Sequence, residues 1–479
     1  MRTRQIWTLA CWMYAVTIAI ADAEETKQPA TESAPVRTLT VDPRAVERPL
    51  MKYRLLPAEY ELRDGNAAPV LLRLPWDQVQ YFLNVVPTFG DYLDLAFDDP
   101  KLVGAEHVFS QAKFEQLKRA AYLRTADWEY PFGEVPLANI LLPDVQGARD
   151  IVGRGLSVWI RHRIAIGKLS DAREGILVGL AVSRHYGRTP FMITQLVCAA
   201  IDSMMLDRLE ELISQPGCPN LYWALAALPH PVIDLQPSAE VEQQMLVGTV
   251  PGLDHLELLK TEAEWNEKAT AIFNLFANED RSSPPVDGNL RLTRVAGWAR
   301  ARQSEWSEFS EVRLEKMSDA EVAVQWLLYL YQDYTQAISA AMRLEPKLAI
   351  PRVAQLNQDL SDLETALGIP TLFVMKSPLS MYLNIHRIER RIKWLQTIEA
   401  LRHYAATHDS SFPKSLDEIV ETPVPSDPFT GQPFHYEANE GAATLRVDGV
   451  EVDERVIGAM HYRIELRGAA ESTRVGPAD

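Results

Sequence analysis

The sequence predicts a mainly α-helical protein, a solenoid-like bundle of helical hairpins, with a small α+β module at its C-terminal end. Two stretches, residues 149–187 and 385–405, place apolar residues every three or four positions, as amphipathic helices do. After residue 433, apolar and polar residues alternate instead, which predicts strands with one buried face.

The chain begins with the features of a secretory signal peptide. Arg2 and Arg4 precede an apolar run over residues 6–20, and Ala21-Asp22-Ala23 is an A-x-A cleavage site. The run is shorter than the roughly 20 residues that a membrane span needs. We therefore expect export to the periplasm, the cell surface or the medium, without stable membrane insertion after cleavage; a retained N-terminal anchor is the alternative.

Composition excludes some partners. The 479 residues are 47% hydrophobic, which suffices for two or three domains. Loss of Arg2, Arg4 and Asp22 with the signal peptide would change the formal net charge from −17 to −18. Such an acidic chain is poorly suited to nonspecific binding of nucleic acid or anionic membranes.

Composition and periodicity also divide the chain into segments. Residues 24–42 are rich in Glu, Thr, Pro and Ala without periodicity, which predicts a disordered linker. The expected segments are a signal peptide (1–23), the linker (24–49), an N-terminal extended and helical segment (50–148), a helical domain (149–380) and the C-terminal module (381–479). Cys198 and Cys218 could pair in an oxidising compartment, or remain two separate buried thiols.

In the N-terminal segment we expect an extended, proline-rich chain over residues 50–74, a short helix over 76–86 and a longer one over 106–123. In the helical domain, Gly167 begins a tight turn between two helices. The Gly and Ala spacing after this turn resembles the second helix of a tetratricopeptide repeat, although Ile160 and Arg163 depart from the first-helix pattern. A generic helical hairpin is the alternative.

Further helices follow the hairpin. One starts at Thr189-Pro190 and runs to about Ile213, and Asn220 is the expected N-cap of the next, over residues 221–228. Apolar spacing predicts another over residues 256–276. Ser318-x-x-Glu321 is a capping box that opens a buried helix, which Pro346 and Pro351 should end, and residues 356–367 should form a further helix closed by Gly368.

The C-terminal module should consist of one long helix laid across three antiparallel strands. Ser415 and Glu418 form a second predicted capping box, with a short helix over residues 416–420. The prolines of residues 423–433 predict a rigid loop with turns. The alternating residues 434–437, 443–447 and 460–466 are the expected strands.

Two resemblances rest on these segments. Residues 412–416 (Phe-Pro-Lys-Ser-Leu) and 427–433 (Asp-Pro-Phe-Thr-Gly-Gln-Pro) resemble the C-terminal region of type II secretion major pseudopilins. That resemblance implies a helix on a small sheet, and often a calcium site. The acidic residues nearby do not align with calcium ligands, and a solvated acidic loop is the alternative; they are Asp448, Glu451, Asp453 and Glu454.

The second resemblance covers most of the chain. It is to a large family of exported bacterial proteins of unknown function, and it implies no activity. The matching segments are Gly217-Cys218-Pro219-Asn220-Leu221-Tyr222-Trp223-Ala224-Leu225, Asp234-Leu235, Gly65-Asn66-Ala67-Ala68-Pro69 and Asp427-Pro428-Phe429-Thr430-Gly431.

No catalytic, cofactor or metal motif is present: there is no H-E-x-x-H, G-x-S-x-G, P-loop or G-x-G-x-x-G. The densest polar and aromatic cluster supplies the candidate ligand-binding residues Asn220, Tyr222, Trp223 and Asp234, and a capped tight turn is the alternative. The best hypothesis is therefore an exported, non-enzymatic scaffold that binds a protein partner in the cell envelope. An envelope hydrolase or glycan-active enzyme with a site built from distant residues, and a component of a secretion or pilus-like assembly, are the alternatives.

Overall fold

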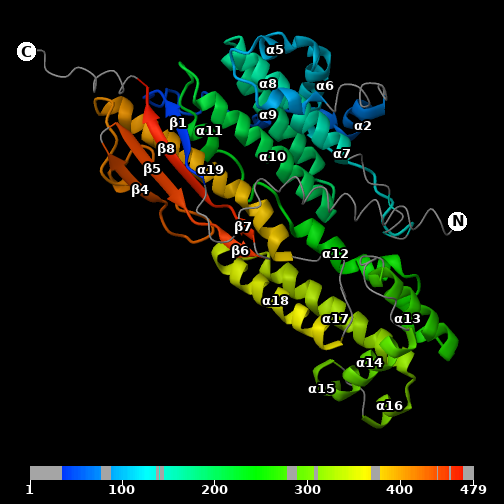
Figure 1. Ribbon diagram of the computed structural model, residues 1–479. Helices are drawn as coiled ribbons and strands as arrows, with labels where there is room; N and C mark the ends of the chain where they lie inside the picture. Colours follow the sequence, from blue (N-terminus) through cyan, green and yellow to red (C-terminus); the bar gives the residue numbers. More distant parts are fainter. Residues whose placement is uncertain are drawn as a thin grey trace, which may run out of the picture.

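The computed structural model describes residues 35–76, 88–135, 137, 140, 145–277, 288–306, 311–367, 378–439, 441–452 and 455–467. The predicted signal peptide and nearly all of the helix expected over residues 76–86 lie outside these ranges. The described chain is mainly helical with a small sheet whose strands come mostly from the C-terminal end, which confirms the predicted fold class at that level (Figure 1).

The long helix α19 (Pro378–Thr407) is the centre of the molecule. Its apolar stripe includes Ile388 and Leu395, which are 1% exposed, and Trp394 packs edge-on against Phe434 and Tyr462 below the sheet. The opposite side of α19 contacts helices α10 and α11, and α18 packs near its start (Figure 1). The predicted amphipathic helix is therefore covered on more than one side.

The sheet has four strands in the order β1-β8-β5-β4, not the three that the sequence predicted. The three expected strands β4 (His435–Asn439), β5 (Ala442–Val447) and β8 (Met460–Leu466) pair in antiparallel fashion. The fourth, β1 (Arg37–Val41), lies parallel to β8 with Leu39 opposite Ile464.

The expected linker therefore needs correction. Residues 37–41, assigned to it on composition, are a strand at the edge of the sheet. Leu39 and Val41 point into the core, with 7% and 0% exposure. These two apolar residues form a period-two pattern that is too short to stand out in a polar stretch, and only pairing with β8 gives them a buried face.

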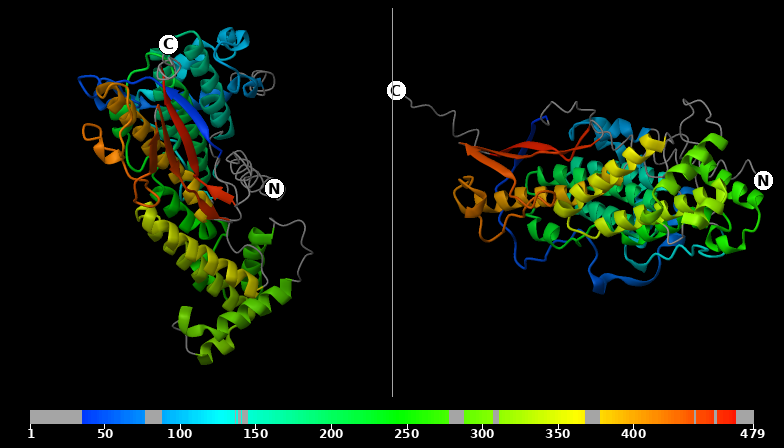
Figure 2. Two further views of the ribbon diagram at one scale, coloured as in Figure 1. Left: turned by 60° about the vertical axis from the view of Figure 1, so that its left-hand side comes forward. Right: turned by 90° about the horizontal axis from the view of Figure 1, so that it is seen from below.

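Shorter strands and helices make up the rest of the N-terminal segment and the sheet connections. The helices are α2 (Ala68–Trp76), α4 (Gly90–Leu93), α5 (Pro100–Val103), α6 (Gln111–Ala121) and α7 (Val145–Ala148). The strands are the parallel pair β2 (Arg63–Asn66) and β3 (Leu123–Thr125), and the hairpin β6 (Val450–Val452) and β7 (Arg455–Ile457). Figure 2 shows the blue segment with β2 on the side of the helices away from the sheet.

The predicted helical hairpin is confirmed as α8 (Leu156–Ala165) and α9 (Leu169–Tyr186), preceded by a π-helix, η5 (Arg149–Gly155), and followed by α10 (Met192–Ile213). Helix α9 lies between α8 and α10. A methyl group at Gly175 would stand 2.6 Å from Ile160, and one at Gly179 would stand 2.2 Å from Sδ of Met205. These two glycines allow the close approach of all three helices.

Helices α11 (Tyr222–Ala226) and α12 (Gln236–Thr249) lead into an elongated arm (Figure 1). The arm contains α13 (Glu262–Ala277), α14 (Gly288–Ala301), α15 (Gln303–Trp306), α16 (Glu311–Lys316), α17 (Asp319–Ala341) and α18 (Pro346–Leu367). Oγ of Ser318 accepts the amide of Glu321 at 3.1 Å, which confirms this predicted N-cap. The expected break at Pro346 and Pro351 was wrong in part, because Pro346 begins α18 and Pro351 lies inside it. A proline without an amide hydrogen is tolerated in the first turn of a helix.

The second predicted capping box, at Ser415, does not form. Residues 416–418 make one 3-10 turn, and the Ser415 side chain makes no cap hydrogen bond. Oε2 of Glu418 instead accepts the amide of Lys414 at 3.1 Å. The Glu418 carboxylate, which the predicted capping box would use, is therefore bound to a different amide, and a single 3-10 turn stands in place of the predicted helix.

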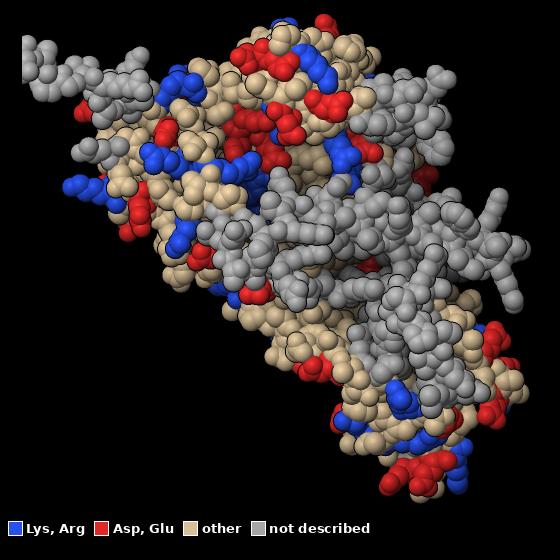
Figure 3. Space-filling view, viewed as in Figure 1, with Lys and Arg blue, Asp and Glu red and all other residues tan. Residues whose placement is uncertain are grey.

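A network of ion pairs surrounds the C-terminal half of α10. Nη2 of Arg391 lies 2.7 Å from Oδ1 of Asp207, and the hydroxyl of Tyr462 donates to Glu210 at 2.8 Å. In Figure 3, acidic side chains gather over α10, beside basic side chains that cross β1 and β8. This network joins α10 to α19 and to the sheet.

The proline loop after α19 is held by a buried ion pair. Nε and Nη2 of Arg390 each donate to one oxygen of Asp427 at 2.7 Å, and both side chains are 1% exposed. Burial favours the neutral acid, but the hydrogen bonds and charge of Arg390 lower the pKa of Asp427 below its ordinary value. Asp427 also accepts the amide of Phe429, so it fixes the turn that precedes β4.

We expect Asp427→Ala to lower the free energy of unfolding by about 3–5 kcal/mol, because it leaves the Arg390 guanidinium buried without its counter-charge. Urea unfolding followed by circular dichroism measures this loss. Asp417→Ala, at an exposed position ten residues earlier, is the control and should change stability little. Equal stability of the two variants would show that the pair does not hold the loop.

Candidate ligand pocket

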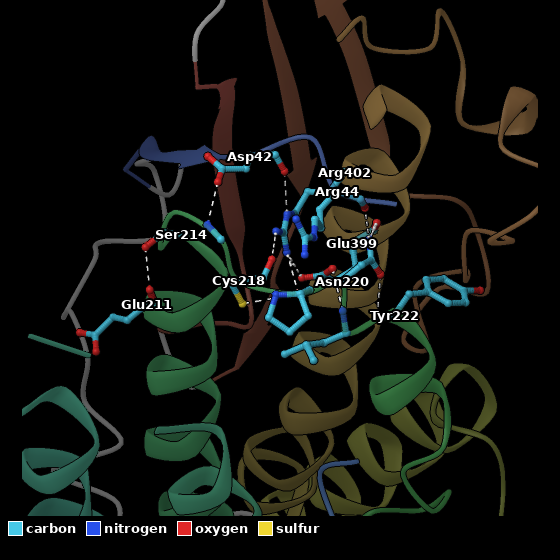
Figure 4. Close-up of polar contacts among 12 residues, drawn as sticks. Asp42, Arg44, Glu211, Ser214, Cys218, Asn220, Tyr222, Glu399 and Arg402 are labelled. Atoms are coloured by element: carbon cyan, nitrogen blue, oxygen red, sulfur yellow. Dashed lines mark hydrogen bonds and ion pairs between the residues drawn. The ribbon is translucent and has the colours of Figure 1, made fainter. Parts of the chain in front are cut away.

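Two of the predicted site residues, Asn220 and Tyr222, lie in a buried polar network at the N-terminal end of α11 (Figure 4). Nδ2 of Asn220 donates to the carbonyl oxygens of Arg44 and Glu399, at 2.9 and 2.8 Å. Its Oδ1 accepts the amide of Tyr222 at 3.0 Å, as expected of a residue that caps α11. Asn220 thus connects three distant segments of the chain.

The same network contains the ion pair between Glu399 and Arg402, both of them 0% exposed. Oε2 of Glu399 accepts the amide of Leu221, and Arg402 donates to the carbonyl oxygens of Asp42 and Cys218 (Figure 4). Burial raises the pKa of Glu399, although the charge of Arg402 acts against it. These hydrogen bonds hold the chain around α19.

Of the four predicted site residues, Asp234 borders a pocket formed by the described residues. The pocket has a volume of about 440 Å³, and Asn220, Tyr222 and Trp223 line neither it nor its smaller neighbour. Its walls are the C-terminal half of α9, the N-terminal half of α10, and residues 56–62, 121–124 and 231–234. Asp234 is exposed at the edge and accepts the amide of Gln236 at 3.0 Å.

Two arginines at the C-terminal end of α9 supply positive charge to this pocket. Arg184 lies in the last turn of the helix, and Arg188 lies in the turn that follows it. Both are exposed, and neither forms an ion pair with a residue in the described ranges. Partial burial, followed by the charge of Arg188, lowers the pKa of Arg184. The third arginine of the pocket, Arg124, is already paired with Glu59.

Helix α10 contributes two buried oxygen acceptors to the pocket. Asp202 is 2% exposed, and its Oδ1 has no hydrogen-bond partner among the described residues. Burial raises the pKa of this carboxyl to about 7. Gln195 donates to the carbonyl oxygens of Gly187 and Thr189 at 3.0 and 2.9 Å, but its Oε1 is likewise without a partner in the described chain.

His185 and Cys198, which also line the pocket, are neutral. Burial, together with the charge of Arg188, lowers the pKa of His185 to about 4, so its imidazole is uncharged at pH 7. Burial raises the pKa of the Cys198 thiol far above its ordinary value, and this thiol donates to the carbonyl oxygen of Ser183 at 3.2 Å. Cys198 and Cys218 are two separate buried thiols, not a disulfide.

A smaller, mostly apolar hollow adjoins the pocket. Its volume is about 10 Å³, and it shares Arg184 and Asp202 with the larger pocket. The remaining walls include Ile388 and Ile392 of α19. This volume is enough for about one group of the size of a water molecule or a methyl group.

Sequence reasoning missed the residues of this pocket, although a signal existed. Asp202 is the one charged residue in the mostly apolar run from Leu196 to Leu206, and a carboxylate inside a buried helix needs a partner or a role. Arg184 and Arg188 carry no such signal, because arginines four residues apart are ordinary on a solvated helix.

Within the described residues, histidine, cysteine and acidic side chains form no group of three or more that could hold a metal ion. None of the helices in that part of the chain is both long enough and apolar enough to span a lipid bilayer. Comparisons with protein-family models, with curated proteins and with solved structures found no match to this chain.

The Asp202 carboxyl predicts a specific dependence of stability on pH. Its pKa is about 7 in the folded chain against an ordinary value of 3.8, so the folded state holds the proton more tightly. The contribution of this carboxyl to stability is therefore fully present below about pH 4 and is lost as the pH rises through 7. We expect Asp202→Asn to be more stable than the unmodified chain at pH 8 by about 2 kcal/mol, since it removes an unpartnered buried charge.

Urea unfolding from pH 4 to pH 8 measures this effect, and the advantage of Asp202→Asn should grow steadily over that range. Asp417→Asn, at an exposed position, should show no such trend. If Asp202→Asn and the unmodified chain lose stability in parallel, Asp202 is not the buried titrating group described above.

Proposed function

We propose that this chain is an exported, non-enzymatic helical binding protein, and that the 440 Å³ pocket takes a small molecule with a negatively charged group. The observation that carries the proposal is the pair Arg184 and Arg188, which line the pocket without ion-pair partners in the described chain. In this proposal α8, α9 and α10 form the repeat-like scaffold that holds the pocket open.

Electrostatics favour an anion at this position. Besides burial, the charge of Arg188 lowers the pKa of Arg184, so the two guanidinium groups repel each other, and an anion between them would remove that repulsion. Guanidinium groups bind carboxylate and phosphate with two parallel hydrogen bonds, which gives both affinity and orientation. The volume of the pocket lies within the range of small-molecule sites.

The side chains that could act as nucleophiles in this pocket support a binding role. The Cys198 thiol is protonated, and the Ser183 hydroxyl donates to the Cys198 carbonyl oxygen at 3.3 Å. Burial raises the pKa of the neighbouring Asp202 carboxyl and the Ser183 hydroxyl acts against it, but the hydrogen bond of this hydroxyl goes to a backbone oxygen, whereas an activated nucleophile would donate to the base. The pocket therefore holds charged groups suited to recognition, and its thiol and hydroxyl are engaged with backbone oxygens.

A hydrolase is the second candidate, favoured by one observation. A carboxyl with a pKa of about 7 inside a pocket, such as Asp202, has the proton affinity of an efficient general base at neutral pH. Turnover of ester or glycoside substrates that is lost in Asp202→Asn would favour this candidate over binding alone.

Calorimetric titration of the purified chain with inorganic phosphate and with acetate tests the proposed function. We expect saturable binding of at least one anion, and an affinity about tenfold lower or worse in Arg184→Gln/Arg188→Gln, which loses two charge-assisted contacts. Arg352→Gln, which removes an exposed arginine from α18, is the matched control and should bind as the unmodified chain does. Equal binding by both variants would place the anion elsewhere, and no binding of either anion would contradict the proposal.

A further inference from the structure

An anion bound to Arg184 and Arg188 would satisfy the positively charged side of the pocket but not the acceptors on the other side. Oδ1 of Asp202 and Oε1 of Gln195 are acceptors on the neighbouring helix, buried to 2% and 1% exposure, and neither has a partner in the described chain. A buried acceptor without a donor costs about 1–3 kcal/mol, and more if it is charged. A ligand that also supplies hydrogen-bond donors would remove this cost.

The arrangement of the two pockets limits how far apart the two ligand groups can be. Arg184 and Asp202 both line the 10 Å³ hollow as well as the larger pocket. The charge of Arg184 also acts on Asp202, which places the two side chains near each other. A ligand group bound by this arginine and one bound by this carboxylate would therefore both border the same small hollow.

This inference rests on the proposed function: we infer that the ligand carries an α-amino acid group. Its carboxylate lies on Arg184 and Arg188, its ammonium donates to Asp202 and Gln195, and a small aliphatic substituent fills the hollow beside Ile392. In an α-amino acid the carboxylate, the ammonium and the substituent are all bonded to one carbon atom. This geometry matches a cation, an anion and apolar side chains that line the same small hollow. The remaining space of the larger pocket is open to a longer ligand, such as a peptide with a free α-amino acid end.

The binding energy follows from the same contacts. An ammonium group would form an ion pair with the buried Asp202 carboxylate, whose Oδ1 is unpartnered in the described chain. The attraction between two opposite charges is stronger in a desolvated site than in water. An apolar substituent the size of a methyl group in the hollow adds up to about 0.8 kcal/mol. The neutral imidazole of His185 adds no charge that would oppose the ammonium.

Titration calorimetry of the unmodified chain with L-alanine, propionate, N-acetyl-L-alanine and ethylamine tests the inference at pH 8. Propionate and the acetylated compound keep the carboxylate but lack the ammonium, whereas ethylamine lacks the carboxylate. We expect L-alanine to bind at least about tenfold more tightly than the other three, since it alone satisfies both helices. This comparison does not depend on the folding of a variant.

Asp202→Asn should abolish the advantage of L-alanine over propionate. Glu242→Gln is the matched control: Glu242 is also buried, with an unpartnered Oε1 in the described chain and a pKa raised to about 7, but it lies outside the pocket. Glu242→Gln should keep the full preference for L-alanine over propionate.

The outcomes separate the two proposals. If propionate binds as tightly as L-alanine, the inference is overturned while the proposed anion site stands. If L-alanine, propionate and inorganic phosphate all fail to bind, the proposed function falls as well. If Glu242→Gln loses the preference for L-alanine as fully as Asp202→Asn does, the Asp202 carboxylate is not the group that recognises the ammonium.

Discussion

The pairing of buried charges along α19 is the constraint on which the structure depends. A charged side chain inside a protein is tolerated only with a counter-charge and hydrogen bonds, so each of these residues dictates what must lie next to it. Arg390 requires Asp427 of the proline loop, and the Glu399–Arg402 pair requires the backbone near residues 42–44 and 218–221. Two distant segments and the approach to the sheet are thereby assembled on one helix.

The pocket lies where this rule is broken. Arg184 of α9, Arg188 just after α9 and Asp202 of α10 form no ion pair in the described chain, whereas Arg390, Glu399 and Arg402 of α19 are all paired. The two sets differ in position: α19 is contacted by α10, α11 and α18, and the pocket lies between α9, α10 and residues 56–62. Two arginines without ion-pair partners and two unpartnered acceptors that line one pocket are the reason to assign binding there and not to the network around Asn220.

Local patterns in the sequence predicted the structure correctly where no other group competed for the same hydrogen-bonding atoms. Ser318 caps α17 as its spacing predicts, and the glycines after Gly167 allow α8 and α9 to pack closely. The equally good signal at Ser415 failed because the Glu418 carboxylate takes another amide. In the polar and aromatic cluster, Oδ1 of Asn220 accepts the amide of Tyr222 at the start of α11. Its Nδ2 donates to the carbonyl oxygens of Glu399 in α19 and of Arg44, and no local pattern could show these two contacts.

Hydrophobic periodicity is a local property, so the long central helix, the helical hairpin and the three antiparallel strands could be predicted from the residues alone. The pairing of residues 37–41 with β8, the separation of the two cysteines and the pocket shared by Arg184 and Asp202 became visible only in the folded chain. Strand pairing and pocket formation depend on which surfaces meet in space, and no local pattern records this. Leu39 and Ile464 are neighbours in the sheet although more than four hundred residues separate them in the chain.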